Sequence, residues 1–325
     1  IMKNICAKIS YISFFILLHF VLAIINIKDT FSKTKTFSQS AFKKKGIALL
    51  DIAYENGIRY FDTAPGYGIA ETLLIDWVKT KNDPSILVGS KWGYTYTANF
   101  DPNAIQHEIK EHSLSKLNAQ WQVSKQLLPY LRFYQIHSAT LATGVLENQE
   151  ILEKLHQLKT VHNLQIGITT SGANQTAILQ KALSIKIAGV ALFSVFQCTY
   201  NPLEQSIYAI AKEISNQNKQ LILKEVLANG RVFTNEAYPH YTNFYNYLHA
   251  LEIKYKVGRD AILMQYAATQ FPKAIVLSGA HHNLQLQSNL KALHLSISPD
   301  ELATLSSFKT APELYWSERK QLNWN

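Results

Sequence analysis

Four residues with side chains suited to proton transfer lie at the ends of predicted strands or in the loop that follows. Asp62, Lys91 and His137 each follow a short apolar run, and Tyr67 lies in the loop five residues after Asp62. The carboxyl ends of parallel strands meet at one end of a barrel, which is where such barrels place their active sites. We therefore expect a carboxylate, a phenol, an ammonium and an imidazole to face one another.

These groups suit the reduction of a carbonyl. A hydride that attacks the carbonyl carbon builds negative charge on the oxygen, which then needs a proton. A phenol with an ordinary pKa of about 10 is a weak acid at neutral pH, and we expect the Lys91 ammonium to lower the pKa of Tyr67. Asp62 can be the counter-ion of a buried Lys91, and His137 can hydrogen-bond the carbonyl oxygen.

Taken singly, each of the four residues has a commoner explanation. An aspartate at a strand end is usually a turn or cap residue, and a loop tyrosine usually packs against its neighbours. A lone histidine or lysine is usually structural or solvated. Only the joint arrangement, at successive strand ends, favours a functional interpretation.

Apolar runs alternate with helical patterns along most of the chain. The expected strands are 58–61, 86–89, 133–136, 164–168, 190–196, 221–226 and 274–278. One helix should end near Asn56, and the others are expected at 71–80, 103–127, 147–160, 175–184, 203–216, 258–270 and 283–293. Repeated strand–helix units predict a parallel sheet covered by helices, which favours a (β/α)8 TIM barrel of the α/β class. The first barrel strand should precede residue 43, where no clear strand pattern is found.

The N-terminal 40 residues differ from the rest of the chain. Residues 9–27 are mostly apolar and follow Lys3 and Lys8, a pattern typical of a secretory signal or a membrane anchor. The alternatives are a buried N-terminal element or a segment that is not part of the working protein. We divide the chain into an atypical segment, 1–40, and a barrel domain, 41–325. We expect a cytoplasmic protein, with membrane association through residues 9–27 as the alternative.

Composition argues against several other classes of protein. The net charge is +9, but residues 1–46 hold eight lysines and one aspartate, so the remainder carries only +2. Nucleic-acid binding is therefore not expected. Cys6 and Cys198 form neither a disulfide framework nor a metal-ligand spacing, so no metal site is expected. No G-x-G-x-x-G follows a predicted strand, which argues against a doubly wound dinucleotide-binding fold.

The segment around Tyr67 resembles a known family. Residues 62–68, Asp-Thr-Ala-Pro-Gly-Tyr-Gly, and Glu71 are similar to the D-T-A-x-x-Y-G-x-x-E segment of aldo-keto reductases. Residues 90–93 and 135–137 resemble the lysine and histidine motifs of that family. Residues 315–319 resemble the tail of a bacterial-type branch, and the whole resemblance covers residues 43–325.

The resemblance implies a function and a set of site residues. It makes Asp62, Tyr67, Lys91 and His137 a catalytic tetrad in a TIM barrel that reduces an aldehyde or ketone, or oxidises the corresponding alcohol or sugar. The implied cofactor is NADP or NAD. The residues that would bind it are Thr169, Gln197, Leu227, Asn229, Arg231, Ser278, Gly279, Gln285 and Asn289.

The chain departs from the family pattern at several positions. The usual first strand, with an L-G-x-G-T-like sequence, is absent, and Thr170 replaces an asparagine expected near the nicotinamide. The segment after the last strand lacks the Lys or Arg that a 2′-phosphate favours, so the choice between NAD and NADP stays open. Trp92 is a candidate for the substrate pocket. The aromatic residues between 233 and 247 either shape that pocket or pack on the outer helices.

Three hypotheses follow. The leading one is an oxidoreductase that acts on a small carbonyl compound with Tyr67 as proton donor. The second is a non-catalytic relative that binds a nicotinamide cofactor, which the missing first strand and the unusual leader would explain. The third is a metal-dependent barrel hydrolase that uses Asp62 and His137.

Overall fold

The computed structural model describes residues 16–19, 38–101 and 104–322. Eight parallel strands form a closed barrel in the order β1-β12-β11-β10-β7-β6-β3-β2. Their bounds are β1 Ile16–His19, β2 Tyr60–Asp62, β3 Leu87–Trp92, β6 Leu131–Ala139, β7 Gln165–Thr170, β10 Phe193–Thr199, β11 Gln220–Lys224 and β12 Ile275–Ser278. The expected (β/α)8 barrel is therefore confirmed.

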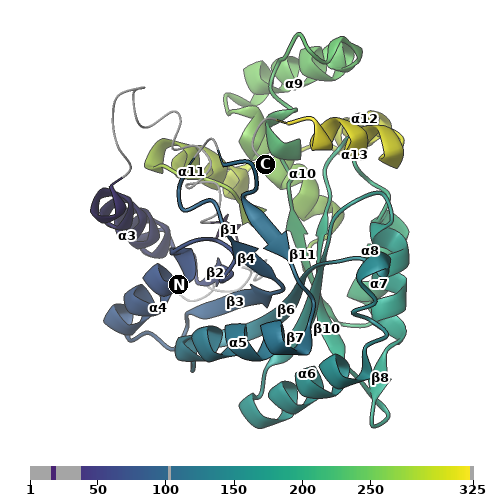
Figure 1. Cartoon of the computed structure of the whole chain (residues 1–325). Coiled ribbons are helices and arrows are strands. Elements are labelled where there is room, and N and C mark those ends of the chain that lie inside the picture. The colour runs from purple at the N-terminus through teal and green to yellow at the C-terminus, as the bar shows by residue number, and fades with distance from the viewer. Residues whose placement is uncertain (1–15, 20–37, 102–103, 323–325) are drawn as a thin grey trace, which may run out of the picture.

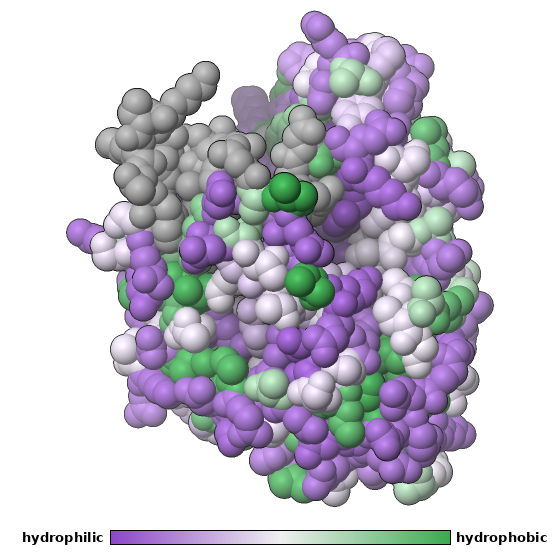
Figure 2. Space-filling model, in the orientation of Figure 1, coloured by the Kyte–Doolittle hydropathy of each residue, from purple (hydrophilic) through white to green (hydrophobic). Residues whose placement is uncertain are grey.

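Helices cover the outside of this barrel (Figure 1). They are α3 Gln39–Glu55, α4 Ala70–Lys81, α5 Leu114–Ser124, α6 Gln149–His162, α7 Gln175–Ser184, α8 Tyr208–Asn216, α9 Thr242–Tyr255, α10 Arg259–Gln270, α11 Asn283–Leu290, α12 Pro299–Ser307 and α13 Pro312–Lys320. Most of the buried apolar side chains lie between the sheet and the helices, and a smaller cluster that includes Tyr60, Phe133 and Val195 fills the inside of the barrel. Figure 2 shows mainly hydrophilic residues on one face of the molecule, with hydrophobic ones scattered among them.

The first barrel strand lies in a part of the chain that we did not expect to contribute to the barrel. β1 pairs with β12 through Ile16↔Val276 and with β2 through His19↔Asp62, and so closes the barrel. The strand position that lacked a recognisable sequence is thus occupied by four residues of the apolar run 9–27, within the segment that the sequence set apart from the barrel. The rest of that run lies outside the described residues. Within the part of the chain that the structure describes, no helix is long and apolar enough to cross a membrane.

The prediction of one long helix over residues 103–127 was wrong. Part of this region is the strand β5 Glu108–Lys110, which forms an antiparallel hairpin with β4 Tyr94–Tyr96 earlier in the chain. The helix α5 begins only after Ser113, whose side chain accepts a hydrogen bond of 3.1 Å from the Lys116 backbone N–H. A serine in this position satisfies a backbone donor that the first helical turn leaves unpaired, so it fixes the helix start there.

Candidate active site

A buried ion pair lies at the carboxyl ends of β2 and β3. Asp62 and Lys91 are each 1% exposed, and the Lys91 ammonium binds the Asp62 carboxylate and donates to the Thr63 carbonyl at 3.1 Å. Burial lowers the pKa of Lys91, while the negative charge of Asp62 raises it and so favours the charged form. Two further donors hold the carboxylate: the Gln197 amide at 3.1 Å and the Tyr60 hydroxyl at 3.3 Å.

Tyr67 reaches over this pair from the loop after β2. Its hydroxyl lies 3.2 Å from His137 Nε2, and the two rings meet edge to face with centroids 5.3 Å apart. The Lys91 Nζ lies 4.9 Å from the centroid of the Tyr67 ring. The structure thus brings together Tyr67 and the three residues that the sequence placed at successive strand ends.

The protonation of Tyr67 differs from the sequence-based expectation. Burial, followed by the negative charges of Asp62 and Glu108, raises the pKa of Tyr67 well above its ordinary value. The expectation that Lys91 lowers this pKa was therefore wrong for the protein alone. The reason is that burial and nearby negative charge both disfavour the phenolate. Tyr67 consequently keeps its proton across the neutral pH range.

His137 is held by contacts that the sequence did not reveal. The Tyr94 ring lies against it, with centroids 4.6 Å apart, and His112 Nε2 donates to the His137 carbonyl oxygen at 2.9 Å. Burial lowers the pKa of His112 to about 4, so this imidazole is neutral. The next residue, Ser138, has a φ of +47°, and its N–H donates to Thr169 Oγ1 at 2.6 Å. Tyr94 belongs to the strand β4, and the alternating Tyr94-Thr95-Tyr96 pattern is the sequence signal that could have predicted this strand.

Trp92 does not join the side chains around Tyr67. Side chains alternate between the two faces of a strand, so Trp92 points away from the face that carries Lys91. It is 1% exposed, packs in the cluster between sheet and helices, and has its ring 5.6 Å from that of His112. Tyr94, rather than Trp92, is the aromatic residue beside the tetrad.

The residues predicted to contact the nicotinamide lie next to the tetrad. Thr169 and Gln197 are register partners at the ends of β7 and β10, and each is 1% exposed. The Gln197 amide donates to the Asp62 carboxylate, so it is continuous with the four residues of the predicted tetrad. Thr170, one residue on, lies 3.5 Å from Gln175 and faces the helix layer.

The residues predicted to contact adenosine also come together. Ser278 and Asn289 share a hydrogen bond of 2.7 Å, and the Gln285 side chain accepts from the His281 N–H at 3.1 Å. Gly279 lies between β12 and α11, in the turn that these bonds fix. This turn stands at the carboxyl end of β12, at the same end of the barrel as the tetrad.

The loop after β11 carries three more residues predicted to bind the cofactor, and the side chain of one of them, Arg231, is already paired within the protein. Leu227 and Asn229 belong to a turn over Ala228–Gly230, in which Asn229 has a φ of +55°. Arg231 is 1% exposed, and its guanidinium bonds the Tyr315 carbonyl at 2.8 Å and the Glu318 carboxylate at 3.0 Å. Arg231 therefore ties this loop to the C-terminal helix α13.

Comparison with known proteins gives the family. The sequence model of the Aldo/keto reductase family matches residues 33–310. The chain belongs to this family. It is 25% identical, over 80% of its length and 70% of the relative's, to the norsolorinic acid reductase of Emericella nidulans. It is 26% identical to an uncharacterized oxidoreductase of Bacillus subtilis, over 85% of this chain and 91% of that one.

Solved structures share the fold. A glycerol dehydrogenase from Gluconobacter oxydans superimposes with a TM-score of 0.68 at 18% identity, over 90% of both chains. An aldo-keto reductase from Bacillus halodurans gives a TM-score of 0.63 at 18% identity, over 85% of this chain and 89% of that one.

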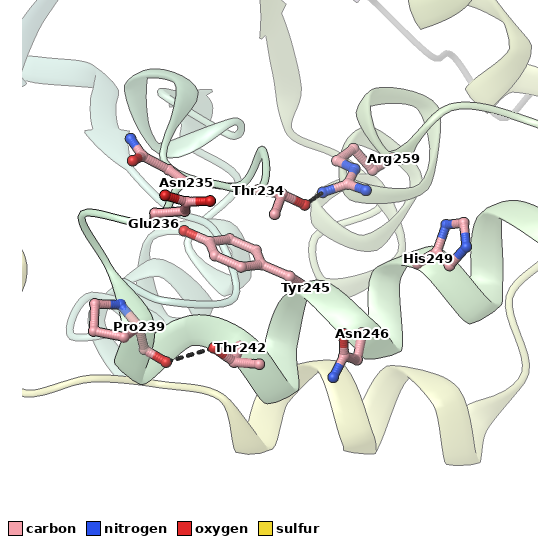
Figure 3. A pocket seen from close by; sticks show the side chains of 9 residues that line it. All are labelled: Thr234, Asn235, Glu236, Pro239, Thr242, Tyr245, Asn246, His249 and Arg259. Carbon is pink, nitrogen blue, oxygen red and sulfur yellow. Dashed lines mark hydrogen bonds between the residues drawn. The ribbon is translucent and has the colours of Figure 1, made fainter.

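In this aldo-keto reductase a cavity of about 450 Å³ lies apart from the tetrad, between the loop after β11, α9 and the start of α10 (Figure 3). Of the aromatic residues between 233 and 247, Tyr245 lines it, while Tyr241 and Phe244 are buried in the core. Tyr241 and Phe244 therefore pack in the core and do not shape a pocket, which was one of the two alternatives expected from the sequence. The lining residues are Thr234, Asn235, Glu236, Pro239, Thr242, Tyr245, Asn246, His249 and Arg259.

Proposed function

We propose that this aldo-keto reductase reduces an aldehyde or ketone with NAD(P)H, and that Tyr67 is the proton donor. The observation that carries the proposal is the contact of the Tyr67 hydroxyl with His137 Nε2 at 3.2 Å, above a buried Lys91–Asp62 ion pair. Two hydrogen-bonding groups this close together can bind a single carbonyl oxygen.

The bound nicotinamide would supply the hydride. The chain's own residues would orient the carbonyl and protonate its oxygen. His137 and Tyr67 would both hydrogen-bond the oxygen, and the Tyr67 proton would move to it as negative charge develops there. An alkoxide is a far stronger base than a phenolate, so a phenol with a raised pKa still transfers its proton in this direction. The Lys91 ammonium, 4.9 Å from the ring centroid, would then stabilise the phenolate, and the negative charge of Asp62 favours the charged form of Lys91 against the effect of burial.

The donor set beside the tetrad fits the cofactor. A carboxamide needs a donor and an acceptor, and the hydroxyl of Thr169 and the amide of Gln197 supply both from neighbouring strands. We assign the pyrophosphate to the loop that holds Leu227, Asn229 and Arg231. The Arg231 side chain is already paired with Glu318, so the backbone of that loop would make the contact.

The adenosine would bind along the turn and helix that follow β12, at Ser278, Gly279, Gln285 and Asn289. Residues 278–289 contain no Lys or Arg. A 2′-phosphate prefers fixed positive charge, so this segment gives NADP no evident advantage over NAD. Titration of the purified protein with each reduced cofactor decides between them.

The test of the proposed function is carbonyl-dependent oxidation of the reduced cofactor. We expect loss of absorbance at the reduced-nicotinamide band with at least one member of a panel of aldehydes and ketones, at a rate proportional to enzyme concentration. Tight binding of the cofactor without turnover of any carbonyl, or of any alcohol in the reverse direction, would instead identify a non-catalytic relative.

A further inference from the structure

Three residues on one face of the C-terminal helix α13 contact the loop that follows β11. Tyr315, Glu318 and Arg319 are spaced three and four residues apart, so their side chains lie side by side on the helix. The loop, residues 225–231, begins directly after β11 and ends at the buried Arg231. α13 therefore packs against the same segment to which we assign the pyrophosphate of the cofactor.

Both ends of this loop are bound by neighbouring residues of the helix. At the first end the Arg319 guanidinium donates to both carboxylate oxygens of Glu225, at 2.8 Å from Nη2 to Oε1 and 3.3 Å from Nε to Oε2. At the other end Arg231 donates to the Glu318 carboxylate at 3.0 Å and to the Tyr315 carbonyl oxygen at 2.8 Å. Two adjacent helix residues thus fix the first and the last residue of the loop.

These two ion pairs are largely shielded from water. The pair of Arg231 and Glu318 is buried, and the side chains of the second pair, Arg319 and Glu225, are only 20% and 12% exposed. Burial raises the pKa of Glu225, but the positive charges of Lys224 and Arg319 lower that pKa to about 2, so the carboxylate is ionised at neutral pH. A guanidinium that donates through two nitrogens fixes the orientation of a carboxylate as well as its charge.

The loop that α13 holds has an unfavourable backbone conformation. Glu225, Ala228 and Asn229 have φ values of +55°, +47° and +55°, in the left-handed region that residues with side chains rarely adopt. Such a conformation persists only where the surrounding contacts hold it. Asn201 and Tyr245 also donate to carbonyl oxygens at the two ends of the loop, so loss of one ion pair should loosen the loop without unfolding it.

We propose that Glu318 and Arg319 are positioning residues for the cofactor, which hold loop 225–231 in the conformation that contacts the pyrophosphate and so limit how fast the cofactor dissociates. A loop that is already ordered saves the free energy that ordering would cost on binding. This inference rests on the proposed function, because it assumes that a nicotinamide cofactor binds beside the loop. Neither residue takes part in hydride or proton transfer in this role, so the chemical step should not depend on them.

The first test is Arg319→Met, which removes the ion pair with Glu225 and keeps a long side chain. We expect the reduced cofactor to dissociate roughly 5- to 50-fold faster in stopped-flow displacement, the effect of losing hydrogen bonds between charged groups that are partly buried. Single-turnover reduction of an aldehyde at saturating cofactor should stay within about threefold of wild type, because the tetrad is unchanged. Arg319→Lys, which keeps the charge but not the two-point contact, should fall between Arg319→Met and wild type.

Trypsin reports on the loop without any cofactor. It cleaves after arginine in segments that open locally, and Arg231 is buried and paired in the folded protein. We expect cleavage after Arg231, identified by mass spectrometry, to be at least about fivefold faster in Arg319→Met than in wild type. An acceleration shared by every cleavage site would show that α13 supports the fold as a whole, and would overturn the inference.

Lys320→Met is the matched control. It removes the same positive charge from the next residue, which is exposed and makes no hydrogen bond or ion pair within the described part of the chain. Cofactor dissociation and cleavage after Arg231 should both match wild type. Effects as large as those of Arg319→Met would show that the net charge of the helix matters rather than the ion pair, which contradicts the inference.

The results separate the inference from the proposed function. If Arg319→Met releases the cofactor and is cleaved at wild-type rates, the inference is wrong while the proposed function stands. Faster cleavage without faster release also overturns it, because the loop would then not hold the cofactor. If wild type binds neither NADH nor NADPH, the proposed function fails and the inference fails with it.

Discussion

The proposed catalytic tetrad and the β4–β5 hairpin differ in where their polar groups find partners. Inside the barrel, Asp62 accepts from Lys91, Gln197 and Tyr60, all carried by strands. On the hairpin, Glu108 is exposed to solvent and has no hydrogen-bond partner within the described residues. The polar groups to which we assign the chemistry are thus held by the strands of the barrel, whereas the charged groups of the hairpin project from a loop that leaves the barrel. Substitutions in the first region should therefore lower turnover far more than substitutions of the exposed hairpin residues.

Lys91→Met should give the largest effect. It leaves Asp62 buried without its counter-ion, which typically costs about 3–5 kcal/mol of the free energy of unfolding. Turnover should fall roughly 10²- to 10⁴-fold, because nothing then stabilises the phenolate of Tyr67. Chemical denaturation and steady-state kinetics measure the two effects.

The double variant Lys91→Met/Asp62→Asn separates stability from chemistry. Since it removes both charges, it should regain most of the stability while staying inactive. A double variant that recovers turnover would show that Lys91 acts only by holding the fold together.

Substitution of Glu71 tests how a residue of the outer helix layer supports the strand that carries Lys91. This residue of α4 is 1% exposed, and its carboxyl accepts from Ser90, the neighbour of Lys91, and from Ser124 at 3.0 Å. Burial raises the pKa of Glu71 to about 7. The folded protein therefore keeps a proton that the unfolded chain releases near pH 4.5, so the stability from this group is present below that pH and is lost as pH rises toward 7.

Glu71→Gln should remove this dependence. The unfolding free energy of Glu71→Gln minus that of wild type should increase by roughly 3 kcal/mol between pH 4.5 and pH 8, because one pKa unit corresponds to about 1.4 kcal/mol. Denaturation curves at four pH values measure the difference. Parallel stability curves for the two proteins would contradict a protonated Glu71.

Gly93 tests the connection between the two regions, and its effect should be the smallest. It joins β3 to β4 with a φ of +115°, and a Cβ there would lie 2.4 Å from His112 Cδ2. Gly93→Ala should cost about 1–3 kcal/mol of stability and raise KM, because His112 and the hairpin must shift. Gly144→Ala is the control: its φ is +62° and its Cβ would meet nothing within 4 Å. Equal losses in both variants would show that backbone strain alone, without the clash, explains the effect.

The sequence predicted the tetrad better than its surroundings, for a physical reason. Asp62, Lys91 and His137 lie at strand ends, and parallel strands in a barrel bring those ends together whatever the loops do. The hairpin depends on pairing between β4 and β5, and no periodicity within residues 103–127 reveals a partner at 94–96. β1 escaped notice because a uniformly apolar run carries neither alternation nor turn residues to mark where a strand begins.

The same limit applies to the residues predicted to bind the cofactor. Motif positions placed Arg231 in the loop after β11, but not the Glu318 carboxylate 87 positions later that binds its guanidinium. Local sequence fixes which residues a loop contains. It does not fix which distant side chains form hydrogen bonds or ion pairs with those residues.

The central claim, that Tyr67 gives the proton, is tested most directly by comparing Tyr67→Phe with Tyr94→Phe in single-turnover reduction of an aldehyde at saturating NAD(P)H. Both variants lose the hydroxyl of a ring that contacts His137, but only Tyr67 is assigned the proton. We expect Tyr67→Phe to bind the reduced cofactor with wild-type affinity and to reduce the aldehyde roughly 10²- to 10⁴-fold more slowly, while Tyr94→Phe stays within about tenfold of wild type. A Tyr67→Phe protein that reduces the aldehyde at the wild-type rate would contradict the account.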